Sequence, residues 1–382
     1  MSLRQSKRSL RIVRREDVFE MKSLVFYKEK LYCFLQERLK KNPKIHYLQR
    51  AWRYRNDEGF VYQVMNINHN PDVMEIKRFG EKNIDSNIYF ISLNGNMMKG
   101  LGGYLRQTLY GLIETDRLGF IPVIYYQPEG CLYAEEEEVN GSGNPFEYYF
   151  EQTSNISVAE VYESGRVFLF NPAHESRIEC DLGNLNPHMA EGYIVDDIYL
   201  GKLATVFKKY IRLNTIVEEH ISEDMQTLCP DGWISKEILG VHIRGTDYAL
   251  NWINHPNMVA VDEFVEAIDE VLEKYDYKYI FLATDDESRL DALKQKYGKK
   301  LIYYKEVARG KGALNIAMEK NNRPMHHYLS GYEVLRDMYT LAGCDSLICG
   351  LSQVAIMARI IRLASEQPYR DSKILDKGIY QG

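Results

Sequence analysis

Residues 238–249 of this 382-residue chain read ILGVHIRGTDYA, and they place an arginine and a carboxylate just beyond an apolar run. The run from Ile238 to Ile243 predicts a buried strand, and Gly245-Thr246-Asp247 predicts the turn that leaves it. An open α/β sheet binds its ligand at the carboxyl ends of its strands, and the planar guanidinium of Arg244 is suited to gripping a phosphate there. The alternative is structural, with a salt bridge from Arg244 to Asp247 that ties the loop down.

Beyond this stretch, apolar strand patterns alternate with amphipathic helix patterns. The expected strands span about 279–283, 300–304 and 346–349, and the expected helices span about 261–274, 288–297, 331–342 and 353–363. Strands separated by helices in this way predict a parallel, doubly wound sheet of Rossmann type in the C-terminal part of the chain.

A second βαβ unit is predicted in the N-terminal part. Its pattern is a strand at 88–93, a glycine-rich loop at 94–103, a helix through Ile113 and a strand at 120–125. Helical spacing also occurs over residues 18–41 and within 194–213. The chain is therefore expected to be an α/β protein, and its length favours two domains that meet near residue 230.

Composition bears on the class of protein. The formal net charge of −6 argues against a general nucleic-acid binder, which usually carries a basic excess. The six cysteines form no CxxC pair and no His/Cys cluster at zinc-site spacing. They are expected to be buried free thiols in a reducing compartment.

The first fifteen residues hold six basic side chains and no acidic one. They are expected to form a solvated tail, with peripheral contact to an anionic membrane or a charged acceptor as the alternative. The sequence contains no apolar segment with the length and flanks of a signal peptide or a membrane span, so a cytoplasmic protein is expected.

Three predicted strand ends carry polar side chains that one edge of a parallel sheet would bring together. Such a cluster, beside the free backbone N–H groups at the start of a helix, favours a phosphate or nucleotide site. Asp285-Asp286 and Ser352 also have the sequence of helix N-caps, which is their structural alternative. The candidates are His242, Arg244, Thr246 and Asp247 after the first strand, Thr284, Asp285 and Asp286 after the second, and Ser352 and Gln353 after the last.

The glycine-rich loop would provide a second wall of the same cleft. Gly100, Gly102 and Gly103 would let the backbone approach a ligand closely, and Arg106 would reach back from the following helix. The loop has neither the spacing nor the lysine-serine end of a phosphate-binding P-loop, and it fits G-x-G-x-x-G poorly. A merely tight turn is the alternative.

Taken together, these motifs resemble those of the superfamily of α1,6-fucosyltransferases and protein O-fucosyltransferases, which includes the rhizobial nodulation fucosyltransferases. The resemblance rests on His242-x-Arg244-x-Thr246-Asp247, on residues 282–286, and on the segment from Asp337 to Gln353. Residues 100–107 resemble the family's glycine loop, and residues 144–150 resemble an aromatic-acidic stretch of such enzymes.

The resemblance implies a two-lobed, GT-B-like fold. Residues 1–230 would form an N-terminal α/β acceptor domain with a helical N-terminal extension, and residues 231–382 would form the Rossmann-like domain that binds the nucleotide sugar. In the family, the arginine that matches Arg244 holds the β-phosphate, so here it would stabilise the departing GDP.

Other positions receive roles from the resemblance as well. His242 and Asp337 match positions that recognise the nucleoside, and Ser352 and Gln353 match positions near the diphosphate. No metal or other cofactor is implied, since an arginine and a helix N-terminus carry the positive charge.

The chain departs from the family in two places. The core α1,6-enzymes have a second arginine directly after the first, where this chain has Gly245, so that charge must come from elsewhere, for which Arg106 is the candidate. Those enzymes also have a catalytic glutamate shortly after the Thr-Asp pair, whereas residues 248–255 contain no carboxylate. The general base stays open, and the candidates are Asp247, His255, Glu147 and Asp262.

The predicted function is therefore inverting transfer of L-fucose from GDP-fucose to a hydroxyl of a glycan acceptor. The expected setting is a bacterial-type cytosolic enzyme of polysaccharide synthesis that binds a GDP-sugar and a glycan, and no nucleic acid. One alternative is an α1,2-fucosyltransferase-like or other GDP-sugar transferase, because the α1,2-enzymes share a His-x-Arg signature that ends in Asp-Tyr, as at 247–248. Another is a non-catalytic glycan- or nucleotide-binding module that keeps the cleft without the base.

Overall fold

The computed structural model describes residues 75–95, 99–171, 193, 196–251, 255–310 and 323–380, without the side chain of Asp247. The chain divides into two units, Met1–Val73 and Met74–Gly382, and all the described elements belong to the second. The helix predicted at 18–41 and the basic N-terminal segment lie outside the described residues.

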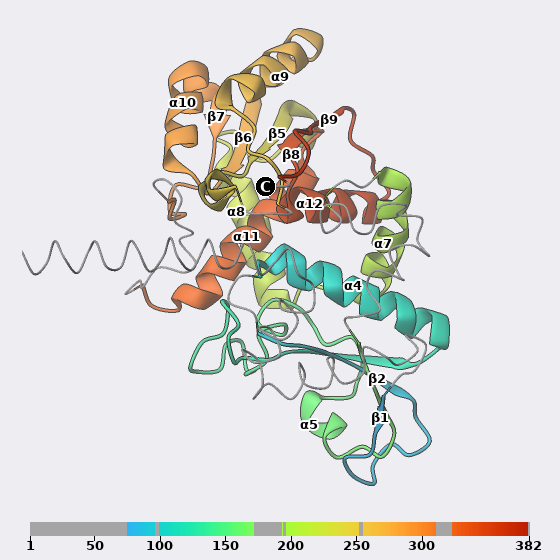
Figure 1. Cartoon of the computed structure of the whole chain (residues 1–382). Coiled ribbons are helices and arrows are strands. Elements are labelled where there is room, and N and C mark those ends of the chain that lie inside the picture. Colours follow the sequence, from blue (N-terminus) through green and yellow to red (C-terminus); the bar gives the residue numbers. More distant parts are fainter. Residues whose placement is uncertain are drawn as a thin grey trace, which may run out of the picture. The chain divides into compact units, whose positions relative to one another are not determined.

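A four-stranded sheet forms the N-terminal part of Met74–Gly382 (Figure 1). β2 runs parallel to both β3 and β4, and β1 pairs antiparallel with β4. The strands predicted at 88–93 and 120–125 are confirmed to within one residue, whereas β1 and β4 are too short to leave a pattern in the sequence. The strand order across the sheet is β1 (Ile76–Lys77), β4 (Val167–Leu169), β2 (Ile88–Leu93) and β3 (Ile121–Tyr126).

Helix α4 (Leu101–Leu118) is the crossover from β2 to β3. Gly100 is its N-cap, so Gly102 and Gly103 lie in the first helical turn and not in the loop where they were predicted. The helix ends at Gly119, whose φ of 68° lies in the left-handed region that favours glycine. Of the glycines at the start of α4, Gly102 packs closely against another helix.

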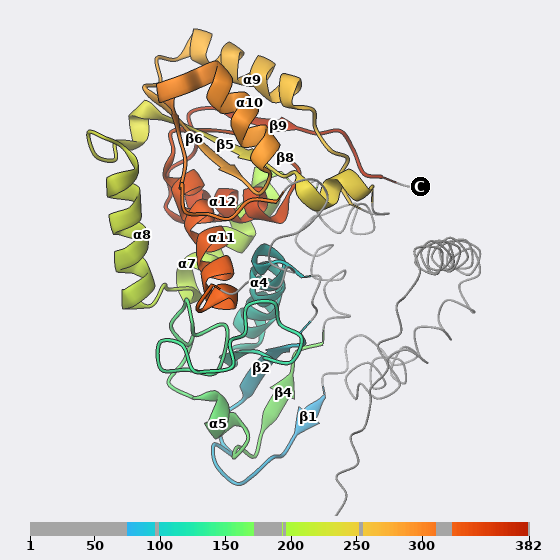
Figure 2. The same ribbon diagram turned by 90° about the vertical axis from the view of Figure 1, so that its left-hand side faces the viewer.

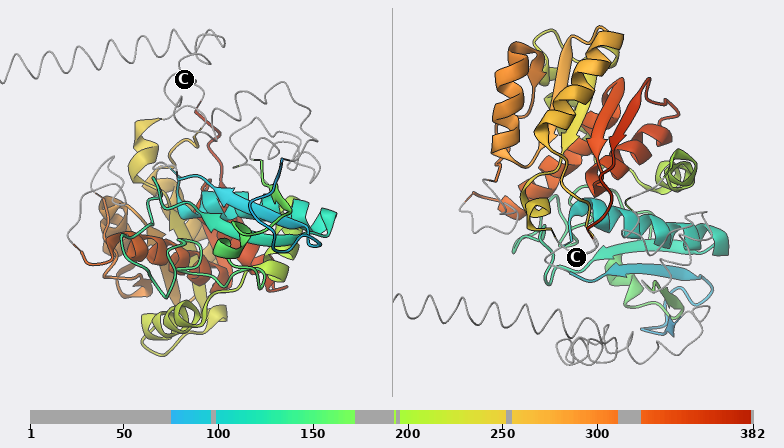
Figure 3. Two further views of the ribbon diagram at one scale, coloured as in Figure 1. Left: turned by 90° about the horizontal axis from the view of Figure 1, so that it is seen from below. Right: turned by 45° about the horizontal axis from the view of Figure 1, so that its top comes forward.

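A five-stranded sheet in which every pairing is parallel forms the C-terminal part (Figure 3). Every residue of its strands β5 and β6 is buried, which explains why their sequences are mostly apolar. The α/β class and the doubly wound C-terminal sheet are therefore confirmed. The strand order is β7 (Leu301–Ile302), β6 (Tyr279–Thr284), β5 (Ile238–Ile243), β8 (Ser346–Gly350) and β9 (Ser372–Leu375).

Helices cover both faces of this sheet (Figure 2). α9 (Val261–Lys274) and α10 (Glu287–Tyr297) pack on one face, and α11 (His326–Gly343) and α12 (Gln353–Ala364) pack on the other. The predicted bounds of α9 are confirmed. α11 begins earlier than predicted because its N-cap is Met325, with a φ of 52° and no side-chain cap, so the sequence carries no start signal there.

Other elements connect the two sheets or flank them. α8 and β9 escaped prediction, since α8 buries only Val217 and Ile221 and β9 is a partly exposed edge strand. The elements are α5 (Val158–Val161), α7 (Asp197–Tyr210), α8 (Thr215–Leu228) and the 3-10 turns η3 (Ser235–Glu237), η4 (Thr246–Leu250) and η5 (Gly298–Lys300).

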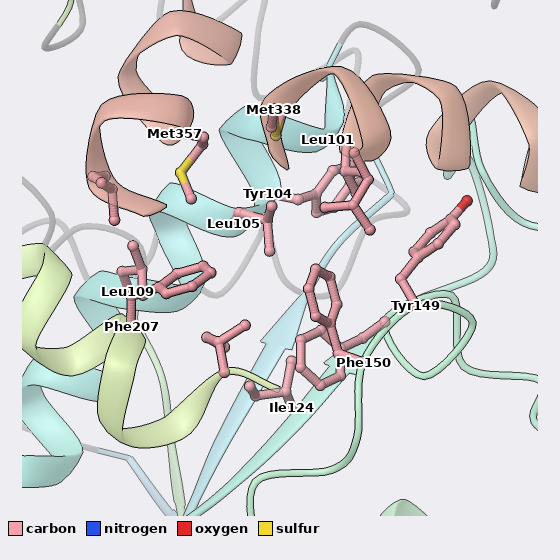
Figure 4. Packing of buried hydrophobic residues seen from close by; sticks show 14 of the residues in the cluster. Leu101, Tyr104, Leu105, Leu109, Ile124, Tyr149, Phe150, Phe207, Met338 and Met357 are labelled. Carbon is pink, nitrogen blue, oxygen red and sulfur yellow. The ribbon is translucent and has the colours of Figure 1, made fainter. Parts of the chain in front are cut away.

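One hydrophobic cluster joins helices that belong to both sheets (Figure 4). Leu105 and Leu109 of α4 pack in it with Phe207 of α7, Met338 of α11 and Met357 of α12. Burying one such side chain stabilises a fold by about 1.5–3 kcal/mol, so this shared core is a major link between the helix layers. β1–β4 precede residue 230 and β5–β9 follow it, but the domain boundary itself stays a prediction.

The described residues also bear on the predictions about membrane-spanning segments and about the cysteines. None of the described helices combines the length and the apolar character that a bilayer crossing requires. The expected buried free thiols are confirmed for Cys131, Cys229, Cys344 and Cys349, while Cys33 and Cys180 lie outside the described residues.

Candidate functional site

The order of the C-terminal strands creates a switch point between β5 and β8. From β5 the chain passes to β6 and β7 on one side, and it then returns to β8 and β9 on the other. Open α/β sheets bind ligands in the crevice beyond the strand ends at such a point. His242 and Arg244 lie at the end of β5, and Ser352 and Gln353 follow β8, so the predicted strand ends do come together.

Arg244 is anchored by the carboxylate of Asp285, which follows the neighbouring strand β6. Arg244 Nη1 lies 2.7 Å from Asp285 Oδ2, while 25% of the arginine side chain stays exposed. The same carboxylate accepts hydrogen bonds from the Gly245 N–H at 2.8 Å and from Thr246 Oγ1 at 2.6 Å. The loop after β5 is thus pinned to the end of β6, and the guanidinium is positioned in advance of ligand binding. The alternative, a salt bridge from Arg244 to Asp247, involves a side chain that the structure does not describe.

Asp285 is ionised at neutral pH. Burial is the largest influence on its carboxyl group and by itself raises the pKa. The charge of Arg244 and the hydrogen bonds from Thr246 and Gly245 act in the opposite direction, and together they hold the pKa of Asp285 below its ordinary value. Asp285 therefore acts as a fixed counter-charge that orients Arg244.

Asp286 caps helix α10. Its Oδ1 accepts hydrogen bonds from the Ser288 N–H at 2.9 Å and from the Ser288 hydroxyl at 2.6 Å, and Arg289 Nε lies 3.4 Å from its Oδ2. The cap alternative is confirmed for this residue. Asp286 also explains Gly245, because a Cβ at that position would lie only 2.6 Å from Asp286 Oδ2. The position of the family's second arginine has no room for a side chain here.

His242 and Ser352 meet across the switch point. Ser352 Oγ accepts the Ala355 N–H at 3.0 Å as the N-cap of α12, and it lies 3.2 Å from His242 Nδ1. Ser352 is therefore confirmed as a helix cap. The same hydroxyl also lies within hydrogen-bond distance of His242, another predicted site residue. Burial lowers the pKa of His242 to about 4, with the charge of Arg244 acting in the same direction and Asp285 opposing it. The imidazole is therefore neutral at pH 7.

A cavity of about 100 Å³ opens beside Arg244. This volume is below the roughly 300–1,000 Å³ of a typical ligand pocket, so the enclosed part has room for only a portion of a nucleotide sugar. Five predicted site residues line it, namely His242, Arg244, Thr284, Asp285 and Asp337. The lining residues that were not predicted are Val307, Ala308, Ser330, Glu333, Val334 and Val354.

The unpredicted lining residues on α11 follow a helical spacing. Ser330, Glu333, Val334 and Asp337 are separated by three or four residues, which places them on one face of the helix. Extending this spacing backwards from Asp337 would have found them in the sequence. Val307 and Ala308 lie in the segment after β7 and carry no motif, so no comparable signal existed for them.

Asp337 is the carboxyl group in this cavity with a strongly raised pKa. Burial raises its pKa to about 7, and the charges of Arg336 and Arg309 oppose this effect without cancelling it. A carboxyl that is partly protonated near neutral pH both donates and accepts hydrogen bonds. This property suits recognition of a neutral polar group.

Asp337→Asn is expected to change how stability depends on pH. Because the folded state holds the Asp337 proton more tightly than the unfolded chain does, ionising this group disfavours folding between about pH 4 and pH 7. The free energy of unfolding of the variant, relative to wild type, should therefore rise with pH across this window, by up to about 1.4 kcal/mol per pH unit, and level off above it.

Urea unfolding of both proteins between pH 4 and pH 8 measures this difference. Asp231→Asn is the matched control: the hydrogen bond from Lys278 lowers the pKa of Asp231, so this carboxyl is ionised in both states over most of the range, and the relative stability of the variant should stay nearly constant above about pH 5. Parallel pH profiles for Asp337→Asn and wild type would contradict the raised pKa.

The start of α4 packs against the start of α12. A Cβ on Gly102 would lie 3.0 Å from Gln353 Cβ, so glycine permits this close approach without displacing Gln353. Gln353 Oε1 is buried without a hydrogen-bond partner among the described residues. The structure thus brings the predicted glycine segment, through Gly102, to the helix start beyond β8. Gly103 faces Lys99 instead, with 3.2 Å between a Cβ there and Lys99 Cγ.

Arg106 does not line the cavity beside Arg244. It is buried on α4, and its guanidinium carbon lies 5.8 Å from the centre of the Tyr110 ring. Its role as a substitute for the family's second arginine stays a prediction.

Among the base candidates, Glu147 is engaged in a local network. Its carboxylate accepts hydrogen bonds from Ser142 Oγ at 2.5 Å, Gln152 Nε2 at 2.7 Å and Asn144 Nδ2 at 3.2 Å. It lines a second cavity, of about 520 Å³, which shares no lining residue with the cavity at Arg244. Glu147 is therefore held in a local network away from the cavity at Arg244, and its role stays a prediction.

The remaining base candidates differ in position. Asp262 is exposed in the first turn of α9, where a carboxylate stabilises a helix. The backbone carbonyl of His255 accepts the Tyr380 N–H at 2.9 Å, and its ring centre lies 6.4 Å from that of Tyr193. No His, Cys, Asp or Glu cluster with metal-binding geometry occurs among the described residues.

A sequence comparison finds a family match for the part of the chain that carries this site. Residues 199–372 match a family model described as the N- and catalytic domains of α-(1,6)-fucosyltransferase. The matched segment includes β5 through β8, the cavity at Arg244 and Asp337, and it leaves Gly100, Gly102 and Arg106 outside the match.

Solved fucosyltransferases have similar but distant folds. NodZ from Bradyrhizobium is 16% identical at a TM-score of 0.42, with 75% of this chain and 94% of that chain covered. A NodZ α-1,6-fucosyltransferase soaked with GDP-fucose gives 17% identity, a TM-score of 0.43 and coverage of 73% and 92%. POFUT1 in complex with GDP-fucose is 12% identical at a TM-score of 0.44, with 78% of this chain and 99% of that chain covered. No curated protein sequence matches the chain.

Proposed function

We propose that this chain is an inverting fucosyltransferase that moves L-fucose from GDP-fucose to a hydroxyl of a glycan. The family match supports glycosyl transfer by residues 199–372. GDP-fucose as the donor, inversion at the sugar carbon and a glycan as the acceptor are the further steps of the proposal.

The observation that carries the proposal is the anchored guanidinium of Arg244 at the switch point. As the bond between the sugar carbon and the β-phosphate oxygen breaks, negative charge grows on the departing diphosphate. A guanidinium held in place by ionised Asp285 stabilises that charge more in the transition state than in the ground state. The N-terminus of α12, beside Ser352, adds a positive dipole end on the same side.

The acceptor half of the reaction needs a proton acceptor. The acceptor oxygen forms a bond to the sugar carbon, GDP leaves from the opposite face, and the hydroxyl proton passes to a base. Asp247 and His255 are the candidates for this base, since Glu147 is held in a local network away from Arg244 and Asp262 lies exposed at the start of α9. We also propose that the reaction needs no metal and takes place in the cytoplasm.

Thermal unfolding with nucleotides provides the first test of the donor. A ligand that binds only the folded state stabilises it by mass action, by about 2.7 kcal/mol at a hundred times its Kd. We expect GDP to raise the unfolding temperature and UDP at the same concentration to leave it unchanged. Equal shifts with both nucleotides would contradict a guanine-specific donor site.

Transfer assays with different donors test the chemistry. Labelled GDP-fucose, GDP-mannose and a UDP-sugar are incubated in EDTA with a panel of glycans, and the anomeric configuration and linkage of the product are determined. Turnover of another nucleotide sugar, with none of GDP-fucose, would contradict the donor assignment. An α1,2 linkage would favour the alternative transferase. A protein that binds GDP-fucose but neither transfers the sugar nor slowly hydrolyses the donor would favour a non-catalytic module.

A further inference from the structure

Arg309 lies in the segment after β7, next to the end of β6. Its guanidinium donates hydrogen bonds to three backbone carbonyl oxygens, from Nε to Thr284 at 3.2 Å, from Nη1 to Val307 at 3.0 Å and from Nη2 to Tyr304 at 2.9 Å. A guanidinium has five N–H donors in a fixed planar arrangement, so a single side chain holds all three carbonyl groups at once. Arg309 thus ties its own segment to the neighbouring strand.

Two of the residues that Arg309 contacts belong to the wall of the cavity at Arg244. Thr284 and Val307 both line this cavity, and so does Ala308, which lies between Val307 and Arg309 in the chain. Arg309 itself is not a lining residue. Its guanidinium therefore joins two stretches of the cavity wall without being part of the wall.

Main-chain hydrogen bonds of the next residue, Gly310, extend this connection. The Gly310 N–H donates to the Asp285 carbonyl oxygen at 2.8 Å, and the Gly310 carbonyl oxygen accepts the Glu287 N–H at 3.1 Å. Asp285 is also the residue whose carboxylate anchors Arg244. These main-chain bonds do not depend on the Arg309 side chain, so the end of the segment should stay attached to β6 when that side chain is shortened.

The part of the segment that Arg309 holds has no regular structure of its own. Residues 303–309 belong to no helix or strand, so their backbone groups need partners outside the regular hydrogen-bond pattern of a helix or sheet. The guanidinium is such a partner for Tyr304 and Val307. Without it, the stretch that carries Val307 and Ala308 should sample several conformations, of which only some leave the cavity in its observed form.

We propose that Arg309 is a positioning residue for the nucleotide, because it holds residues 304–308 against the end of β6 and so keeps the cavity at Arg244 in the form that binds a nucleoside diphosphate. This inference rests on the proposed function, which supplies the nucleoside diphosphate as the ligand. It gives a role to an arginine that lies outside all the sequence motifs.

Arg309→Met tests the proposal because it keeps a long side chain and removes every donor. The apparent Kd rises in inverse proportion to the fraction of molecules in the binding conformation, so a segment that keeps this conformation about a tenth of the time raises the Kd about tenfold. We expect a rise of this size in the Kd for GDP, measured by titration calorimetry. Arg309→Lys should recover only part of the affinity, since an ammonium group restores the charge without the planar set of donors.

Arg362→Met is the matched control. The guanidinium of Arg362 also donates to backbone carbonyl oxygens, those of Ala342 at 3.1 Å and Pro368 at 3.2 Å, and Arg362 lies outside the residues that line the cavity. Its loss should lower the unfolding temperature and leave the Kd for GDP unchanged.

Hydrogen exchange separates positioning from a general loss of stability. Amide exchange in peptides that cover residues 303–310 should be faster in Arg309→Met than in wild type without nucleotide, and it should slow again when GDP saturates the variant. In Arg362→Met the exchange of these peptides should match that of wild type. Unchanged exchange in Arg309→Met would contradict the role given to the guanidinium.

The binding measurements distinguish the inference from the proposed function. A folded Arg309→Met protein that binds GDP like wild type, full recovery of affinity by Arg309→Lys, or an equal loss in Arg362→Met would overturn the inference, while wild-type binding of GDP still supports the proposed function. Should Arg309→Met not fold, Arg309→Lys provides the test alone, since a Kd equal to that of wild type contradicts the inference. Wild-type protein that does not bind GDP would overturn both.

Discussion

Arg244→Ala is expected to slow sugar transfer by about 10²- to 10³-fold, the effect of removing one well-placed donor to a developing negative charge. The loss should appear mainly in kcat, because the charge on the diphosphate is largest in the transition state. Arg244→Lys should recover only part of the rate, since an ammonium group lacks the planar pair of donors. Steady-state kinetics with GDP-fucose measure both variants.

A control separates this effect from a general loss of an arginine. Arg370 forms an ion pair with Asp345 at 3.0 Å, lies outside the residues that line the cavity, and has 47% of its side chain exposed. Arg370→Ala should leave kcat unchanged. Because Arg244→Ala leaves the Asp285 carboxylate without its counter-charge, urea unfolding must show that the variant is folded under assay conditions. An unchanged kcat in folded Arg244→Ala would rule out its proposed role.

Gly245→Arg, which restores the family's second arginine, is expected to destabilise the protein and not to raise activity. A Cβ at this position would meet the Asp286 carboxylate, and Asp286 is fixed by its cap on α10. Forcing atoms into a packed site costs about 1–3 kcal/mol, and even Gly245→Ala should lose that much. Displacing Asp286 would also disturb the loop that positions Arg244.

Unfolding in urea measures the loss at Gly245. Gly143→Ala is the matched control, because a Cβ on Gly143 meets no atom within 4 Å, and its stability should stay within about 0.5 kcal/mol of wild type. A Gly245→Arg protein as stable as wild type, with faster transfer, would show that the position accepts a side chain.

The C-terminal sheet could be predicted from the sequence because its strands are buried on both faces. The runs at 238–243 and 279–284 are apolar except for His242 and Thr284, and α9 has a clear amphipathic spacing. β9 and α8 left no such pattern, since both bury few side chains. The start of α11 was misplaced because Met325 caps it only through backbone geometry.

The site was predicted in outline and not in its internal roles. That Arg244, His242 and Asp337 would meet follows from strand ends and from a family resemblance. That Asp285 holds Arg244 while the adjacent Asp286 caps a helix depends on which way each side chain points. Two neighbouring aspartates look alike in a sequence, and only the register of β5 against β6 separates them.

The shared core of α4, α7, α11 and α12 has a consequence for how a nucleotide sugar enters. Two-lobed proteins commonly admit ligands by swinging their lobes apart about a hinge. Here such a swing would pull Leu105 and Leu109 away from Met338 and Met357, and it would expose that apolar surface to water. The two halves of Met74–Gly382 therefore share one packed core, and we expect a nucleotide to reach Arg244 without separation of these four helices.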